Sequence, residues 1–237
     1  MKVEISEKIE YITSGENPLS SDVVFIKGDK AIWIFDVGAN DEAFNAIAEI
    51  ISDADREKDV NIVISHFHRD HMGNLERIAK IPTVGNCVNL YVSKYTYKHC
   101  NIGTVVEEDI IINDGVKIHI FPMPSSHSKG CLCLEADDEA VFIGDAIYPA
   151  YKSIEDEDSG KMSACYDKFE NRGEYRKQHK VYNVQHLKQQ IDILKSLEAK
   201  KIYLAHEKKP LVRREIIVVF LERIYKKREQ GNPFILQ

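Results

Sequence analysis

Hydrophobic residues along this chain fall mainly into short uninterrupted runs that are bounded by glycine, asparagine, aspartate or charged residues. Runs of this length are typical of β-strands, and a run that is apolar at successive positions indicates a strand covered on both faces. We predict strands at residues 23–27, 31–35, 60–65, 90–93, 109–112, 117–121, 131–135, 140–144 and 201–205.

Other segments repeat their apolar residues at helical spacing and predict amphipathic helices. They lie at residues 41–54, 184–199 and 210–228. Asn40 or Asp41 would cap the first of these helices, and Asn74 would cap a further short helix that begins at Leu75.

The order of these elements predicts an α/β (α+β) fold. Strands in the early and late parts of the chain, with helices between them, suit an αββα sandwich of four layers. The length of 237 residues suits a single domain over 1–237. Residues at about 150–182 depart from the pattern because they are polar and heavily charged. We expect them to form an insertion or lid that selects the substrate.

Composition narrows the class of protein. The formal net charge of −6 argues against a protein that grips a phosphate backbone, so nucleic acid is not the expected partner and a small-molecule substrate is. We expect no membrane span, and the acidic N-terminal segment lacks a secretory signal, which predicts a cytoplasmic protein. The 5 cysteines show no framework spacing and are expected to be buried thiols. The oligomeric state is left open.

Histidine and aspartate are concentrated directly after the strand at 60–65. The segment 66–71 holds the side chains His66, His68, Asp70 and His71. In an extended chain His66 and His68 project to the same side, because side chains alternate with a period of two. Imidazole nitrogen and carboxylate oxygen are the ligands that zinc prefers, so the segment predicts part of a metal site.

Further candidates come at or just after the ends of other predicted strands: His127, Asp145 and His206, with Asp36 in a similar position. Binding sites in open sheets gather beyond the carboxyl ends of the strands, so these residues can converge although they are distant in sequence. The remaining histidines lack such a context. His119 is expected at the surface, and His99, His179 and His186 have no companions at ligand spacing.

These residues resemble the motifs of the metallo-β-lactamase superfamily, from about residue 20 to residue 207. The family signature His-x-His-x-Asp-His stands here as His66-Phe-His68-Arg-Asp70-His71, and the later motifs follow in order at His127, Asp145 and His206. The early aspartate motif is matched by Asp36-Val-Gly38. The resemblance implies the four-layer αββα sandwich of the metallo-β-lactamase type.

The resemblance also implies a site for two divalent ions, zinc in the first place, with iron or manganese as alternatives. One ion would be held by His66, His68 and His127. The other would be held by Asp70, His71 and His206, with Asp145 bridging the two. Asp36 would support the ligand loop from behind. Asp145 stands where one lactamase subgroup has cysteine, and His68 stands where the diiron oxygen reductases of the superfamily typically have glutamate.

The function implied is a dinuclear metal-dependent hydrolase of the lactonase and hydroxyacylglutathione-hydrolase branch. A metal-bridging hydroxide would attack an ester, lactone or thioester carbonyl, with phosphodiester hydrolysis as the alternative. Asp70 would orient the nucleophile or pass a proton. Tyr148 lies three residues after Asp145, the offset of a substrate-positioning tyrosine in acyl-homoserine lactonases, although it could equally be an ordinary loop residue.

Two hypotheses from other classes remain at this stage. A diiron centre on the same scaffold would perform redox chemistry instead of hydrolysis. A non-catalytic metal-binding module would retain the ligands without turnover. The presence of all seven candidate ligands argues against a decayed site.

Overall fold

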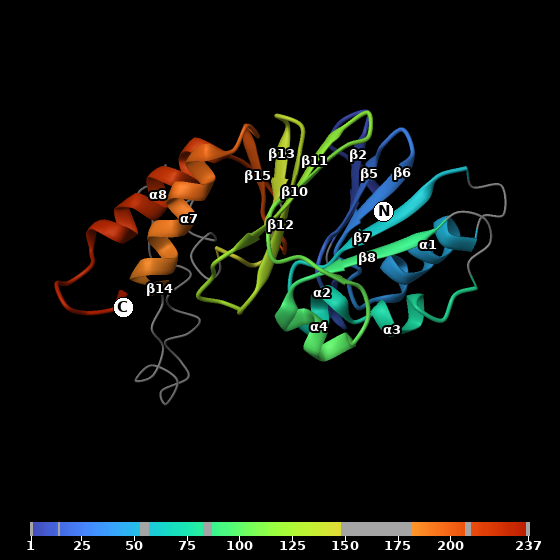
Figure 1. Ribbon diagram of the computed structural model, residues 1–237, viewed down its shortest axis with the longest axis horizontal. Helices are drawn as coiled ribbons and strands as arrows, with labels where there is room; N and C mark the ends of the chain where they lie inside the picture. Colours follow the sequence, from blue (N-terminus) through green and yellow to red (C-terminus); the bar gives the residue numbers. More distant parts are fainter. Residues whose placement is uncertain are drawn as a thin grey trace.

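The computed structural model describes residues 2–13, 15–52, 57–82, 87–147, 182–206 and 210–235. Over these residues the chain forms two large β-sheets packed face to face, with helices on both outer sides (Figure 1). This is the four-layer αββα arrangement that the sequence predicts.

The first sheet has strand order β1-β2-β5-β6-β7-β8-β9 within the described residues. Its strands are β1 (Lys2–Glu4), β2 (Ile9–Ile12), β5 (Val23–Lys27), β6 (Ala31–Phe35), β7 (Asp59–Val63), β8 (Val88–Val92) and β9 (Thr104–Val105). Pairing is antiparallel up to β6 and parallel from β6 to β9. The carboxyl ends of β6, β7 and β8 therefore lie at one edge of the sandwich.

The second sheet has strand order β10-β11-β12-β13-β15-β16 over the same described part of the chain. Its strands are β10 (Ile110–Asn113), β11 (Lys117–Met123), β12 (Cys131–Ala136), β13 (Ala140–Phe142), β15 (Lys201–Tyr203) and β16 (Leu211–Arg213). β13 and β15 are parallel neighbours, and Phe142 pairs with Tyr203. The chain therefore leaves both strands at the same end of the sheet.

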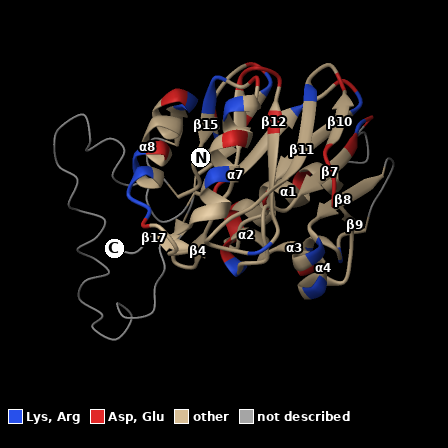
Figure 2. Ribbon diagram, turned by 60° about the vertical axis from the view of Figure 1, so that its left-hand side comes forward, with Lys and Arg blue, Asp and Glu red and all other residues tan. Residues whose placement is uncertain are grey.

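The outer layers consist of amphipathic helices. α1 (Asp41–Ser52), with the short α2 (Arg69–Met72), α3 (Leu75–Ile78) and α4 (Lys94–Cys100), lies on the side of the first sheet, and α7 (Val184–Ser196) and α8 (Arg214–Lys226) cover the second (Figure 1). Two small antiparallel pairs, β3 (Gly15–Glu16) with β4 (Leu19–Ser20) and β14 (Tyr182–Asn183) with β17 (Phe234–Ile235), complete the described elements. Charged residues lie mostly on helices and turns, and the strands consist largely of other residues (Figure 2).

Side chains of the central strands alternate between two apolar layers. In β5, Val24 and Ile26 pack between the sheets, whereas Val23 and Phe25 pack beneath α1. The inter-sheet layer also contains Trp33, and the helices α7 and α8 bury a third apolar cluster against the second sheet. Burial on both faces is the reason that these strands read as continuous hydrophobic runs.

Several boundaries differ from the prediction. The helix predicted at 210–228 begins only at Arg214, because Leu211–Arg213 pairs with β15 as a strand. The predicted short helix after Asn74 is a single turn, and the Asn74 side chain does not cap it. Its amide instead donates to the backbone oxygens of Val37 and Asn40, which ties this turn to the loop after β6.

The cysteine prediction is correct in part. Cys131 and Cys133 are fully buried free thiols, and burial raises the pKa of Cys131 to about 12. Cys87 is exposed, so the expectation of burial was wrong there. It lies just before β8, outside the apolar part of that strand. In the described residues, no helix has the length and apolar character needed to cross a bilayer.

Candidate metal centre

All seven predicted ligands meet at one edge of the sandwich, where loops leave the carboxyl ends of strands from both sheets. β7 leads into the segment that begins at His66, and the loop between β11 and β12 carries His127. Phe142 and Tyr203 are paired across β13 and β15, and Asp145 and His206 come three residues after them, respectively. Matched strand register therefore delivers two of the candidate ligands from one sheet at the same level.

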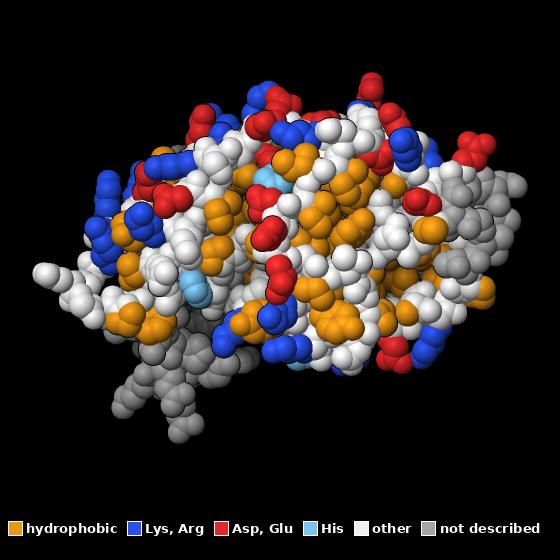
Figure 3. All heavy atoms as spheres, in the orientation of Figure 1, with side chains coloured by type: hydrophobic (Ala, Val, Ile, Leu, Met, Phe, Trp, Pro, Cys, Tyr) orange, Lys and Arg blue, Asp and Glu red, His pale blue; other side chains and the backbone are white. Residues whose placement is uncertain are grey.

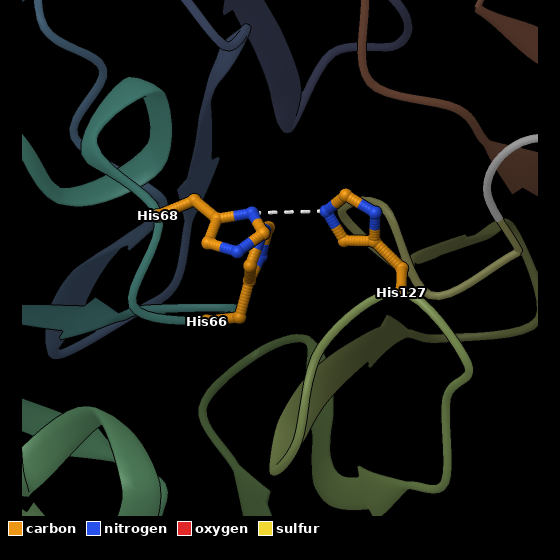
Figure 4. A group of neighbouring side chains, drawn as sticks. All are labelled: His66, His68 and His127. Atoms are coloured by element: carbon orange, nitrogen blue, oxygen red, sulfur yellow. Dashed lines mark hydrogen bonds between the residues drawn. The ribbon is translucent and has the colours of Figure 1, made fainter. Parts of the chain in front are cut away.

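The first group of candidate ligands consists of His66, His68 and His127, with one ring nitrogen from each within 4.8 Å of the others. His68 and His127 approach from the two sheets with their rings nearly perpendicular, at 79°, and His127 Nε2 lies 3.0 Å from His68 Nδ1 (Figure 4). Neutral imidazoles that converge in this way offer lone pairs to one common point.

The second group consists of Asp70, His71, Asp145 and His206, with one ligand atom from each within 4.8 Å of the others. His206 Nε2 lies 3.2 Å from Asp70 Oδ2 and 3.3 Å from His71 Nε2. His71 Nε2 lies 3.5 Å from Asp145 Oδ2. Donor atoms that share a tetrahedral zinc ion at about 2.0–2.1 Å stand about 3.3–3.4 Å apart, so these separations fit an ion.

Asp145 belongs to both groups by distance. Its Oδ2 lies 3.4 Å from His127 Nε2 in the first group and 3.5 Å from His71 Nε2 in the second. A carboxylate in this position can bind one ion on each side. The two groups are therefore neighbouring parts of one centre.

Two buried polar atoms of the centre lack a hydrogen-bond partner among the described residues: His66 Nε2 and Asp145 Oδ1. Buried polar atoms without partners are uncommon in proteins, because the lost hydration is not replaced. A cation coordinated by both atoms would remove this penalty. The donor set of imidazole and carboxylate is the one that zinc prefers, so the residues fit the metal that the resemblance implies.

Asp36 holds the ligand loop from behind through three hydrogen bonds. Its Oδ1 accepts from the backbone N–H of Ser65 at 2.7 Å, and its Oδ2 accepts from the Ser65 hydroxyl at 2.8 Å and from His71 Nδ1 at 2.7 Å. Ser65 Oγ also lies 3.0 Å from His66 Nδ1. Since the serine hydrogen goes to Asp36, the serine oxygen accepts from His66.

This network determines which ring nitrogens are available. His66 and His71 both carry hydrogen on Nδ1, and both therefore present Nε2 to the centre. The role of Asp36 agrees with the expectation from the family resemblance. Ser65 was not singled out from the sequence, although its place directly before His66 could have drawn attention to it.

The backbone around the network is closely fitted. Gly144, which precedes Asp145, has a φ of +51°, and a Cβ at this position would lie 2.6 Å from Ser65 Oγ. Asp36 and His206 also have positive φ, at 59° and 66°. Conformations of this kind are sparsely populated by residues other than glycine, and they cluster at functional sites.

Burial and neighbouring charges shift the pKa values of the candidate ligands in different directions. Burial lowers the pKa of His127 to about 4 and that of His66 far below its usual value. Burial would also lower the pKa of His71, but the charges of Asp36 and Asp145 outweigh it and raise that pKa well above the ordinary value. The first group is consequently neutral and able to bind a cation at neutral pH.

Burial opposes ionisation of Asp70 and Asp145, but their histidine partners prevail. The hydrogen bond with His206 lowers the pKa of Asp70, and the hydrogen bond with His71 lowers that of Asp145. Both carboxylates are therefore ionised at neutral pH. The neutral imidazoles of the first group beside the ionised carboxylates of the second are a suitable environment for divalent cations.

Two further histidines lie outside both ligand groups. His119 is only partly exposed, because its ring bridges Glu135 at 3.2 Å and Asp109 at 3.0 Å on the outer face of the second sheet. The prediction that it lies at the surface is therefore correct only in part. His99 stacks on Phe67 with ring centroids 4.3 Å apart, so α4 packs directly behind the ligand loop. Tyr148 and the predicted insertion, apart from Tyr182, lie outside the described residues.

The chain matches the family described as the metallo-beta-lactamase superfamily over residues 17–206, and it belongs to that superfamily. A metallo-beta-lactamase from Pontibacter korlensis has a similar structure, with a TM-score of 0.63 and 14% identity, and the match covers 96% of this chain and 99% of that one. A structure described as "Peroxy diiron species of chemotaxis sensor ODP" matches with a TM-score of 0.62 and 15% identity, covering 94% of this chain and 93% of the other. No curated protein matches the sequence.

Proposed function

We propose that this protein is a dinuclear metal-dependent hydrolase that cleaves an ester, lactone or thioester. The observation that carries the proposal is the pair of adjoining ligand groups that share Asp145. His66, His68 and His127 would hold one ion, and Asp70, His71 and His206 the other. Two divalent cations there, zinc in the first place, would supply a nucleophile at neutral pH and polarise the bond to be cleaved.

The protein's own contribution is to hold these groups in place. Asp36 and Ser65 fix the tautomers of His66 and His71, so that no proton has to move before a cation binds at Nε2 of His66. Asp70 lies at the edge of the second group and is partly exposed. It is the carboxylate best placed to orient the attacking group or to pass a proton to the leaving group.

Charge distribution supports a small substrate. On the face shown in Figure 3, acidic and basic side chains of the described residues are interspersed. A protein that binds nucleic acid gathers its lysine and arginine side chains into a patch or stripe. Together with the net charge of −6, the mixed charges on this face favour a small-molecule substrate over nucleic acid.

The test is turnover of a substrate panel by zinc-loaded protein. The panel holds a simple ester, a lactone, a thioester, a phosphodiester and a β-lactam. We expect one carbonyl substrate to be cleaved far faster than the others, with turnover lost on chelation. His66→Ala should lower kcat/KM by more than about 100-fold, since changes behind the ligands alone cost 10–100-fold.

His119→Ala is the control for His66→Ala, because His119 is also shielded and bound to carboxylates but lies outside the centre. It should retain wild-type turnover. If the phosphodiester were cleaved fastest, the protein would be a phosphodiester hydrolase and the proposed carbonyl substrate would be refuted. Equal turnover by His66→Ala and wild type would refute the assignment of the site.

A diiron redox protein is the second candidate, because a diiron protein is among the similar structures. Elemental analysis of protein produced without added metal distinguishes the two. Zinc in excess supports the hydrolase. Iron in excess, with absorbance in the visible range and no hydrolysis of the panel, would support the redox protein instead.

A further inference from the structure

A buried hydrogen bond joins the two sheets close to the second ligand group. The hydroxyl of Tyr203 donates to Asp22 Oδ2 at 2.6 Å, and the two residues are separated by 181 positions in the chain. Tyr203 is 2% exposed and Asp22 is 4% exposed. Hydrogen bonds to an ionised acceptor are about twice as strong as neutral ones, so this is a strong tie in a dry environment.

Each end of this bond lies next to a candidate ligand. Ser21, the neighbour of Asp22, donates its backbone N–H to the carbonyl oxygen of Asp70 at 2.8 Å. Tyr203 is the last residue of β15 and is followed three residues later by His206. The tie therefore connects the segment that supports Asp70 with the strand that delivers His206.

The aromatic ring of Tyr203 is held independently of its hydroxyl. It packs edge-on against Tyr11 at a centroid distance of 5.2 Å and, in a tilted arrangement, against Phe142 at 5.3 Å. Burial beside Asp22 raises the pKa of Tyr203 beyond any physiological value, so the phenol remains a donor. A change to phenylalanine keeps the ring contacts and removes only the cross-sheet hydrogen bond.

We propose that Asp22 and Tyr203 are positioning residues that hold Asp70 and His206 at the separation required to bind the second ion. The proposal rests on the proposed dinuclear function. His206 Nε2 and Asp70 Oδ2 come from different sheets and lie only 3.2 Å apart. If one sheet edge shifted relative to the other, the distance between His206 and Asp70 would change, whereas distances within a single loop would not.

The experiment titrates Zn²⁺ into chelator-treated Tyr203→Phe and follows binding by calorimetry. We expect the first ion to bind as in wild type and the second to bind about 10–100-fold more weakly, the range for residues that orient ligands. Asp22→Ala removes the acceptor instead of the donor and should show the same selective loss. It tests the proposal even if Tyr203→Phe does not fold.

Matched controls come from the opposite end of the sandwich. Trp33 Nε1 donates to Asp114 Oδ2 at 3.1 Å, which is also a buried bond from an aromatic side chain to a carboxylate across the sheets. Trp33→Phe and Asp114→Ala should lower the unfolding temperature but leave both zinc affinities unchanged. Loss of the second ion in these controls as well would overturn the positioning role.

The two proposals fail in different ways. If wild-type protein binds no zinc at either group, the dinuclear function fails and this inference fails with it. If wild type binds two ions and Tyr203→Phe and Asp22→Ala bind both with wild-type affinity, the dinuclear function stands and the positioning role is refuted.

Discussion

At the scale of single residues, the centre depends on side chains that would not themselves touch an ion. Asp36 accepts hydrogen from Ser65 twice and from His71 once, and it is 1% exposed. All three hydrogen bonds are therefore shielded from water. The orientation of two candidate ligands, one in each group, consequently depends on one carboxylate.

Asp36→Asn tests this dependence. The amide keeps the shape of the carboxylate but turns an NH₂ group towards N–H or O–H donors, so at least one buried donor loses its partner. We expect the free energy of unfolding to fall by about 1–3 kcal/mol. We also expect zinc affinity to fall about 10–100-fold. Urea unfolding of the metal-free protein and calorimetric titration measure the two effects.

Asp114→Asn is the matched control. Asp114 is also buried, and it accepts from the backbone N–H groups of Lys30 and Ala31 and from Trp33 Nε1, away from the centre. A similar loss of stability without a loss of zinc affinity is expected. Unchanged zinc affinity in Asp36→Asn would contradict the supporting role of Asp36.

At the scale of elements, local caps and tertiary contacts decide where helices begin. α7 starts at Val184, and the Asn183 side chain accepts from the backbone N–H of His186 at 3.0 Å. α4 begins in the same way after Ser93, which accepts from Thr96, and it packs on the ligand loop through His99 and Phe67. The residues of α4 do not repeat apolar side chains at helical spacing, so the sequence did not predict this helix.

Asn183→Ala tests the cap of α7. Loss of the side-chain acceptor should lower the free energy of unfolding by about 1 kcal/mol. The reason is that a backbone N–H of the first turn, which has no acceptor within the helix, loses its partner. Asn183→Asp retains an acceptor and should restore wild-type stability. Urea denaturation gives both values, and equal stability of Asn183→Ala and wild type would show that the cap contributes nothing.

At the scale of the whole molecule, the centre takes its ligands from loops of both sheets at one edge of the sandwich, so ion binding should stabilise the entire sandwich. An ion that binds only the folded state adds about 2.7 kcal/mol to the free energy of unfolding when its free concentration is 100 times its Kd. For a chain of this size, that corresponds to an increase in unfolding temperature of about 5–10 °C. Calorimetry with and without chelator, on wild type and His66→Ala, measures it.

The contrary outcome is also clear. A chelator that leaves the unfolding temperature of wild type unchanged would show that no stably bound ion bridges the folded sheets. A smaller shift in His66→Ala than in wild type is expected, because one ligand of the first group is absent.

The sequence alone predicted most strands and helices and singled out the seven candidate ligands. The strand and helix patterns and the segment His66 to His71 are local: burial on both faces produces the apolar run at 60–65, and His66 to His71 are neighbours in the chain. The three distant candidates, His127, Asp145 and His206, were singled out by their places at the ends of predicted strands and by the family motifs. Only the tertiary structure decided the edge strand Leu211–Arg213 and the pairing of Asp22 with Tyr203. These depend on contacts between distant segments, whose partners leave no periodic pattern in either segment until the sheets are assembled.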